Sequence, residues 1–270
     1  MLLSSLTQHQ LIRPAPLLRF ASTQIKLFSS SSMAASPKVA MILAGSGVYD
    51  GSETTEAVAA IVQLSKHGCD THMFAPNEDQ MHVVNHLTGE EMPNEKRNVL
   101  VESARIARGK VKPATELNPA DYDALILPGG FGAAKNLCNF ATTLGAGKGT
   151  PEDMVVQPSI AKIVTDFNTQ KKVIGACCIA PVILAKVLPG VNVTMGCSSG
   201  DDFPFAGATG AVEALGGTHE ETQAPCKDVC IDHDKLVVTS AAYMYDGKPH
   251  EVFESVCAMV DAVVDLAKQN

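Results

Sequence analysis

The sequence predicts a single α/β domain with a mostly parallel sheet and helices on both faces. Three observations carry this prediction. A continuous apolar run at residues 38–44 is typical of a strand that is buried on both faces. Apolar residues then recur at helical spacing until Gly68, and a second strand is expected at residues 71–75. Strand, helix and strand within about forty residues form a βαβ unit, whose crossover is right-handed.

The same alternation continues to the end of the chain, with no repeat and no sign of a second domain. Further helices are expected at residues 98–108, 159–167, 179–188, 212–215 and 252–267. Further strands are expected at residues 122–127, 172–176, 191–195, 229–231 and 236–239. For the first helix, Ser52 is the expected N-cap, with Glu53 and Glu56 in the first turns, where the helix dipole favours acids.

Composition excludes several classes of protein. Of the 270 residues, 46% are hydrophobic and 19% are charged, which is typical of a globular core rather than of a disordered chain. No apolar run approaches the ~20 residues that span a bilayer. The net charge of −8, without a basic stripe beyond the N-terminus, argues against nucleic acid or an anionic membrane as the main partner. The eight cysteines form no compact disulfide framework.

Residues 1–36 resemble an organellar targeting segment. They contain Arg13, Arg19 and Lys26, many serines and no acidic residue. A basic, Ser-rich, acid-free leader is typical of a transit peptide, whereas Arg13 and Pro14 interrupt the apolar core that a secretory signal needs. We therefore expect a mitochondrial transit peptide at 1–36, a domain at 37–270 and a location in the matrix, where thiols stay reduced.

The best candidate for a reactive residue is a cysteine between a predicted strand and a predicted helix. A nucleophile elbow needs small residues two positions before and after the nucleophile. Cys178 meets this condition with Ala176 and Ala180, whereas the neighbouring Cys177 has Ile179 on one side. A thiol at a helix N-terminus is expected to be partly ionised. The alternative is that Cys177 and Cys178 are small buried hydrophobic residues without a reactive role.

Two further segments leave strand carboxyl ends and are expected to converge with the elbow. The glycine loop with Gly129 and Gly130 can bring backbone N–H groups close to a ligand, and those of Gly130 and Ile179 are the natural pair to bind an oxyanion. Glu53 follows the first strand and can hydrogen-bond the thiolate or move a proton. Glu56 is the alternative candidate for this role, although it lies about one turn further into the helix.

At this point three segments resemble a known family. They are residues 47–53 (GVYDGSE), 128–136 (PGGFGAAKN) and 178–181 (CIAP), and the similarity runs from about Lys38 to the C-terminus. They resemble the ThiJ/PfpI branch of the class I glutamine amidotransferase-like superfamily. Within it they are most similar to the bacterial lycopene-biosynthesis-enhancing glyoxalases and their mitochondrial homologues in animals.

The resemblance implies a flavodoxin-like three-layer sandwich with a mostly parallel central sheet, usually dimeric. It places the elbow cysteine at Cys178, the glutamate after strand one at Glu53, and the glycine loop at Gly129 and Gly130. Amidotransferases use a late His-x-Glu pair in their triad. None of the late histidines, His219, His233 and His250, is assigned that role here, so glutaminase activity is not expected. The resemblance therefore implies a cofactor-free glyoxalase or deglycase that acts on a small aldehyde such as methylglyoxal, as a homodimer. The alternative is a mitochondrial protein without turnover that senses oxidation or binds a partner through the same fold.

Other motifs point to weaker alternatives. The pair Gly45 and Gly47 follows a strand, but Asp50 stands where a dinucleotide fingerprint has its third glycine and would repel a pyrophosphate. Cys226 and Cys230 have an allowed zinc spacing, but the surrounding histidines are irregular, so no metal is expected.

Overall fold

The computed structural model describes residues 36–270, so the leader expected at residues 1–36 lies outside the described residues except for Ser36. The described part is built on a seven-stranded sheet with the strand order β10-β11-β7-β6-β1-β2-β5. Every neighbouring pair is parallel except β10 and β11. The strands are β1 (Lys38–Ile42), β2 (Asp70–Ala75), β5 (Val111–Pro113), β6 (Ala124–Leu127), β7 (Val173–Cys177), β10 (Cys230–Asp232) and β11 (Val237–Ser240).

Two short strand pairs lie apart from the main sheet. One is the antiparallel pair β3 (Val84–Asn85) and β4 (Glu90–Glu91), and the other is the parallel pair β8 (Asn192–Val193) and β9 (Thr218–His219). The sequence analysis expected a strand at residues 191–195 but neither β9 nor the β3–β4 pair. Strands of two residues carry too little alternation to be recognised from their pattern.

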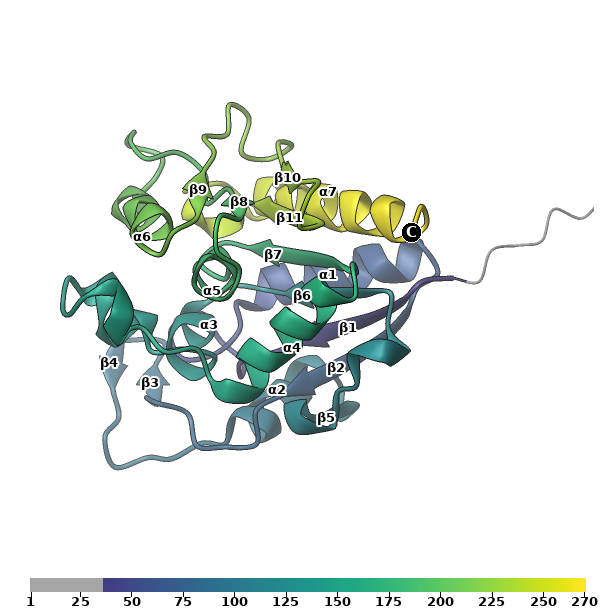
Figure 1. Cartoon of the computed structure of the whole chain (residues 1–270). Helices are drawn as coiled ribbons and strands as arrows, with labels where there is room; N and C mark the ends of the chain where they lie inside the picture. The colour runs from purple at the N-terminus through teal and green to yellow at the C-terminus, as the bar shows by residue number, and fades with distance from the viewer. Residues whose placement is uncertain (1–35) are drawn as a thin grey trace, which may run out of the picture. The chain divides into compact units, whose positions relative to one another are not determined.

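Helices cover both faces of the sheet, as expected for this fold class. They are α1 (Thr54–Lys66), α2 (Val99–Ile106), α3 (Phe131–Asn136), α4 (Pro158–Thr169), α5 (Pro181–Val187), α6 (Thr209–Ala214) and α7 (Pro249–Ala267). In Figure 1, α1 and α7 lie side by side behind the sheet, whereas α4 and α5 lie in front of it. The result is a flavodoxin-like three-layer sandwich, which confirms the predicted fold class.

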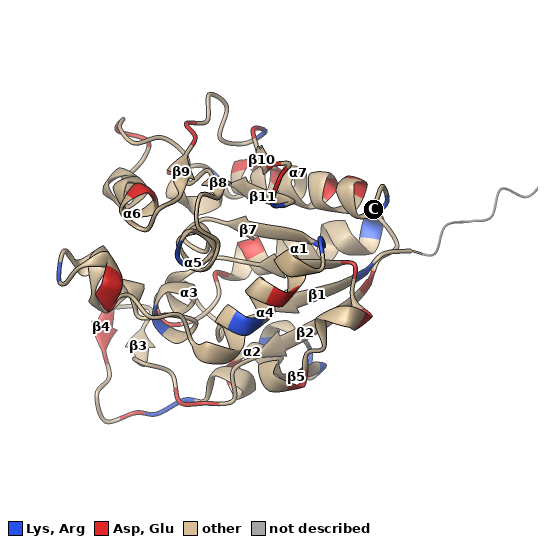
Figure 2. Ribbon diagram, in the orientation of Figure 1, with Lys and Arg blue, Asp and Glu red and all other residues tan. Residues whose placement is uncertain are grey.

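The core is aliphatic and excludes charge from the central strands. β1, β6 and β7 are buried along almost their whole length, and β6 and β7 carry no charged residue. Figure 2 shows the acidic and basic residues on the helices and loops around these strands. No helix among residues 36–270 is long and apolar enough to cross a membrane.

Strand order fixes where a ligand site belongs. From β1 the chain moves outward through β2 to β5, and then returns to β6 on the other side of β1. Ligands of open α/β sheets bind beyond the carboxyl ends of the strands at such a reversal. The segments that leave β1, β6 and β7 there are the three that the sequence analysis expected to converge.

Candidate active site

Cys178 occupies a tight turn between β7 and α5. Its φ is 58°, a left-handed conformation that is costly for a residue with a side chain. The turn is held by a hydrogen bond of 3.1 Å from the Cys178 N–H to the carbonyl of Ser240, the last residue of the neighbouring strand β11. The flanking Ala176 and Ala180 are fully buried, so larger residues would not fit. This is the geometry of a nucleophile elbow.

The two adjacent cysteines have different surroundings. Cys178 lines a cleft of about 610 Å³ and is 7% exposed, whereas Cys177 is fully buried. Burial raises the pKa of the Cys178 thiol well above its ordinary value, and the nearby Glu56 carboxylate raises it further. The sequence analysis expected a partly ionised thiol from the helix dipole; here the cost of burying the charge exceeds that effect. The group is therefore a thiol at neutral pH.

Glu56 is the acid that lies beside both thiols. Its Oε2 accepts a hydrogen bond from the Sγ of Cys177 at 3.8 Å. Oε2 of Glu56 and Sγ of Cys178 lie 2.7 Å and 2.9 Å from the position that a Cβ on Gly129 would occupy, so the carboxyl and the Cys178 thiol are neighbours. The same carboxyl accepts the N–H of Gly129 at 2.9 Å and the N–H of Tyr243 at 3.2 Å. The residue is fully buried, and this burial raises the pKa of Glu56 to about 7. A carboxyl with this pKa can accept and return a proton near neutral pH.

Glu53, the acid expected from the sequence, has a different position. It is the N-cap of α1, and its Oε2 accepts the N–H of Glu56 at 2.8 Å. Its side chain lines the cleft and is half-buried, which raises its pKa. Its hydrogen bonds go to the first turn of α1, whereas the thiols lie beside Glu56.

The expected N-cap, Ser52, has another partner. Its hydroxyl accepts the N–H of Ala44 at 2.9 Å, which closes the turn after β1. The helix therefore begins one residue later than predicted, with Glu53 as its cap. This start turns Glu56 onto the face of α1 that also buries Ala60 and Leu64. Glu56 stands four residues before Ala60 and eight before Leu64, so it shares a helix face with buried apolar residues. This spacing was the signal in the sequence that could have identified Glu56.

The glycine loop after β6 packs directly against this site. A Cβ at Gly129 would lie 2.4 Å from the Cβ of Cys178 and 2.7 Å from Oε2 of Glu56, so only glycine fits. Gly130 has a φ of 93°. The backbone N–H groups of Gly130 and Ile179, which the sequence analysis paired as an oxyanion site, lower the pKa of the Cys178 thiol and so offset part of the cost of forming a thiolate there.

The mouth of the cleft is aromatic. The rings of Tyr49, Phe131 and Phe205 are each more than one third exposed, and Phe131 lies 6.4 Å from Tyr49 and 6.1 Å from Phe205 between ring centroids. Tyr243 and Tyr245, which follow β11, also line the cleft. Sequence reasoning did not find this wall, because its members come from segments that are distant in the chain.

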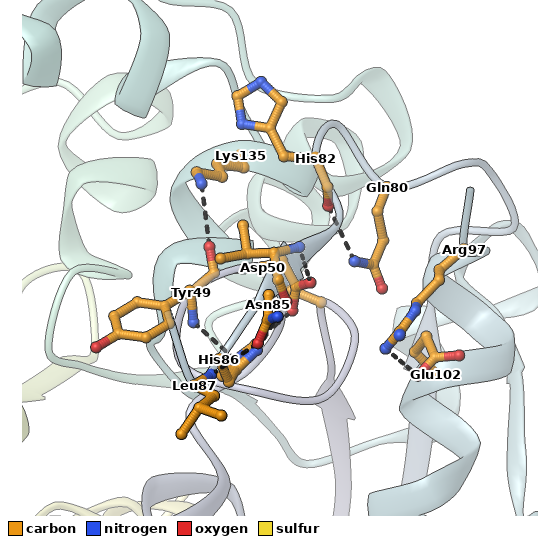
Figure 3. Close-up of polar contacts among 12 residues, drawn as sticks. Tyr49, Asp50, Gln80, His82, Asn85, His86, Leu87, Arg97, Glu102 and Lys135 are labelled. Carbon is orange, nitrogen blue, oxygen red and sulfur yellow. Dashed lines mark hydrogen bonds and ion pairs between the residues drawn. The ribbon is translucent and has the colours of Figure 1, made fainter. Parts of the chain in front are cut away.

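The loop that carries Tyr49 is fixed from outside the cleft (Figure 3). The N–H of Tyr49 donates to Nε2 of His86 at 3.2 Å, and its carbonyl accepts from Nζ of Lys135 at 3.0 Å. Asp50, which was considered as an obstacle to a pyrophosphate, is buried and accepts the N–H of Val84 at 2.8 Å. This contact ties β3 to the loop after β1.

Neither a histidine nor a metal cluster is found at the site. No histidine lines the cleft in the part of the chain that the structure describes. Within residues 36–270, no three His, Cys, Asp or Glu side chains are placed to hold a metal ion. His219, one of the late histidines, accepts the N–H of Met195 at 3.1 Å. A thiol and a carboxyl are therefore the groups that this site offers for chemistry.

Comparison with known proteins places the chain in two steps. No protein-family model matches the sequence. The solved structure of an isoprenoid biosynthesis protein with an amidotransferase-like domain from Ehrlichia chaffeensis has 33% sequence identity and a TM-score of 0.74, covering 85% of this chain and 98% of that one. The fold and the elbow thus define an amidotransferase-like protein.

The curated relatives are more specific. The ES1 protein homolog, mitochondrial, of Rattus norvegicus is 45% identical over 231 residues, which cover 85% of this chain and 84% of the rat protein. A human relative, glutamine amidotransferase-like class 1 domain-containing protein 3, mitochondrial, is 44% identical over 231 residues. The matched residues cover 85% of this chain and 83% of the human protein. The chain belongs to the ES1 family of glutamine amidotransferase-like proteins. The resemblance inferred from the three sequence segments is confirmed at this level.

Proposed function

We propose that this protein is a cofactor-free enzyme of the glyoxalase or deglycase type, which acts on reactive carbonyl compounds through Cys178. The observation that carries the proposal is the proximity of the Cys178 thiol, which lines the cleft, to the buried carboxyl of Glu56 with a pKa of about 7. A nucleophile with a neighbouring base whose pKa lies near neutral pH is the arrangement that covalent catalysis requires.

The proposed reaction begins with addition of the thiol to an aldehyde. As the sulfur of Cys178 forms a bond to the aldehyde carbon, the carbonyl π electrons move to oxygen and the thiol proton passes to Glu56. The proton then returns to that oxygen, which gives a hemithioacetal. The N–H groups of Gly130 and Ile179 favour this step, because they lower the pKa of the thiol that must lose its proton.

For a ketoaldehyde such as methylglyoxal, the adduct then rearranges. The Glu56 carboxylate removes the proton on the former aldehyde carbon, which gives an enediolate with the charge on the former ketone oxygen. The proton of the neighbouring hydroxyl passes to that oxygen, and Glu56 delivers its proton to the former ketone carbon as the other oxygen becomes a carbonyl. The adduct is then a thioester of a hydroxy acid. Water hydrolyses the thioester and releases lactate and the free thiol. One molecule of methylglyoxal and one of water give one of lactate, with no external oxidant or reductant.

The role of proton carrier goes to Glu56 in this proposal, whereas the sequence analysis gave it to Glu53. The position of the Glu56 carboxyl beside the Cys178 thiol supports the change, since a general base must reach the proton that it removes. Glu53 remains a lining residue of the cleft.

The test is lactate formation from methylglyoxal by the purified full chain, with Cys178→Ala and Cys177→Ala in parallel. We expect turnover by the wild type, its loss in Cys178→Ala and its retention in Cys177→Ala. Equal activity of wild type and Cys178→Ala would overturn the proposal and favour the alternative, a protein of this fold that senses oxidation or binds a partner.

We also propose a mitochondrial location, in the matrix. The names of the rat and human relatives give a mitochondrial location for those proteins. The basic, acid-free segment at residues 1–36 is typical of a transit peptide. N-terminal sequencing of the protein from purified mitochondria tests this proposal: a start between about residues 20 and 40 is expected, and recovery of intact Met1 would contradict it.

A further inference from the structure

The cleft above Cys178 is too large for a three-carbon aldehyde. Its volume of about 610 Å³ lies within the range of roughly 300–1,000 Å³ that is typical of sites for drug-sized ligands. Methylglyoxal has only a few heavy atoms and would leave most of this space to water. The size of the cleft therefore points to a substrate with a substantial group next to its reactive carbonyl.

The chemistry of the wall indicates what that group is. Six aromatic side chains line the cleft, together with apolar residues such as Val48, Ile179 and Met244. The aromatic residues are Tyr49, Phe131, Phe140, Phe205, Tyr243 and Tyr245. Aromatic rings pack favourably edge-to-face or offset against other rings. Tyr49, Phe131 and Phe205 leave large apolar surfaces exposed at the mouth, and contiguous exposed surfaces of this kind are typical of ligand sites.

The charges of the lining exclude another class of ligand. Glu53 and Asp246 are the ionisable acids of the wall, and no Lys, Arg or His lines the cleft within residues 36–270. Lys135 donates to the Tyr49 carbonyl and its Nζ lies 5.7 Å from the Phe131 ring centroid, but it is not a lining residue. A carboxylate or phosphate on the ligand would thus find no partner and would meet acids instead.

We propose that the substrate of this site is an aromatic carbonyl compound without an acidic group, either neutral or cationic, whose ring is held by Tyr49, Phe131 and Phe205 while its carbonyl reaches Cys178. This inference rests on the proposed function, because it names the substrate class of the same site. It places the specificity of the enzyme in the aromatic wall and leaves the chemistry to Cys178 and Glu56.

A binding experiment tests the wall without requiring turnover. Four unreactive ketones are titrated into the wild-type full chain by calorimetry: acetophenone, its 4-trimethylammonio derivative, 4-acetylbenzoate and acetone. We expect acetophenone and the cation to bind at least roughly tenfold more tightly than acetone, because burial of the ring contributes. We expect 4-acetylbenzoate to bind roughly fivefold or more weakly than acetophenone, because of its charge.

Variants assign the effect to the wall. Phe205→Ala is expected to weaken acetophenone binding by roughly tenfold, whereas Val101→Ala, which removes an exposed apolar side chain on α2 far from the lining, leaves it unchanged. Asp246→Asn is expected to reduce the discrimination against 4-acetylbenzoate. The proposed substrate class would be overturned if acetone bound as tightly as acetophenone, or if 4-acetylbenzoate bound as tightly as acetophenone.

A kinetic experiment separates this inference from the proposed function. We expect kcat/KM for phenylglyoxal to exceed that for methylglyoxal by roughly tenfold. Turnover of both aldehydes without this preference would overturn the substrate class and leave the proposed function standing. Selective binding of the aromatic ketones without turnover of either aldehyde would overturn the proposed function and leave an aromatic ligand site.

Discussion

The base and the mouth of the cleft differ in burial and in packing. At the base, Cys178, Glu56 and Gly129 are in close contact and shielded from water, and backbone N–H groups hold the carboxyl in place. At the mouth, Tyr49, Phe131 and Phe205 come from separate segments of the chain and are exposed. Under the proposed function, reactivity and selectivity therefore belong to separate parts of this site. Changes at the base are expected to alter the chemical step, and changes at the mouth to alter binding.

The largest effect is expected from the acid at the base. Glu56→Gln removes the proton carrier and should reduce kcat/KM for glyoxals by roughly 10²–10⁴-fold, the usual contribution of a general acid–base. Because the Glu56 pKa is about 7, kcat/KM of the wild type should rise with pH through that value, and Glu56→Gln should lose this dependence. Glu53→Gln, one turn earlier on the same helix, is the control. A larger loss in Glu53→Gln than in Glu56→Gln would assign proton transfer to the rim of the cleft.

The same carboxyl should make stability depend on pH. Its pKa is raised from 4.5 to about 7 in the folded chain, so the native state keeps the proton up to a higher pH than the unfolded chain does. Its contribution to the free energy of unfolding is therefore present in full below pH 4.5 and is lost as pH rises through 7, by roughly 3 kcal/mol in all. Urea unfolding at pH 5 and pH 8 measures the loss.

The control for this experiment is the exposed acid Glu90. Glu90→Gln should keep the pH dependence of the wild type, whereas Glu56→Gln should reduce it. Glu56→Gln also places an amide N–H₂ against one of the two backbone donors, so its stability should be lower at both pH values. The slope between the two pH values is the diagnostic quantity, and an unchanged slope would contradict the assigned pKa.

The close approach of the glycine loop predicts a third, smaller effect. Gly129→Ala adds a Cβ that would lie 2.4 Å from the Cβ of Cys178, so the loop or the elbow must move, at a cost of about 1–3 kcal/mol in unfolding free energy. Thermal unfolding of Gly210→Ala is the matched control, since no atom lies within 4 Å of the added Cβ in α6. Gly210→Ala should be neutral or slightly stabilising. Equal stability of the two variants would show that the base is less tightly packed than its geometry indicates.

The smallest effect is expected at the mouth. Lys135→Met removes the hydrogen bond to the Tyr49 carbonyl and the ammonium near Phe131, both of which fix the aromatic wall. KM should rise by roughly threefold with kcat unchanged, because only ground-state binding is affected. Lys148→Met in the exposed loop at residues 144–151 should change neither constant. A fall in kcat in Lys135→Met would show that mouth and base are coupled.

The sequence predicted the fold and the elbow because both leave regular patterns. Buried parallel strands produce continuous apolar runs, and the elbow requires small residues at fixed distances from Cys178. The acid was harder to place. The spacing of Glu56 with the buried Ala60 and Leu64 was a signal in its favour. The first residue of α1 was less predictable, because the Ser52 hydroxyl bonds Ala44 across a turn and so does not cap the helix.

The aromatic mouth could not be predicted for a different reason. Tyr49, Phe131 and Phe205 are separated by more than seventy residues from each other in the chain and meet only because β1 and β6 are neighbours and a late loop folds over them. Each is a single aromatic residue in its segment, where hydrophobic periodicity carries no information. Contacts of this kind depend on the tertiary fold.

The two backbone N–H groups that donate to the Glu56 carboxyl make this residue important for folding as well as for the proposed chemistry. Its carboxyl joins three segments: α1, the glycine loop after β6 through Gly129, and the segment after β11 through Tyr243. Loss of the acid would leave buried N–H groups without partners, which is costly for folding. If the proposed function holds, a relative without turnover would still be expected to retain Glu56 for folding. Loss of Cys178 would then be the more specific sign of lost catalysis.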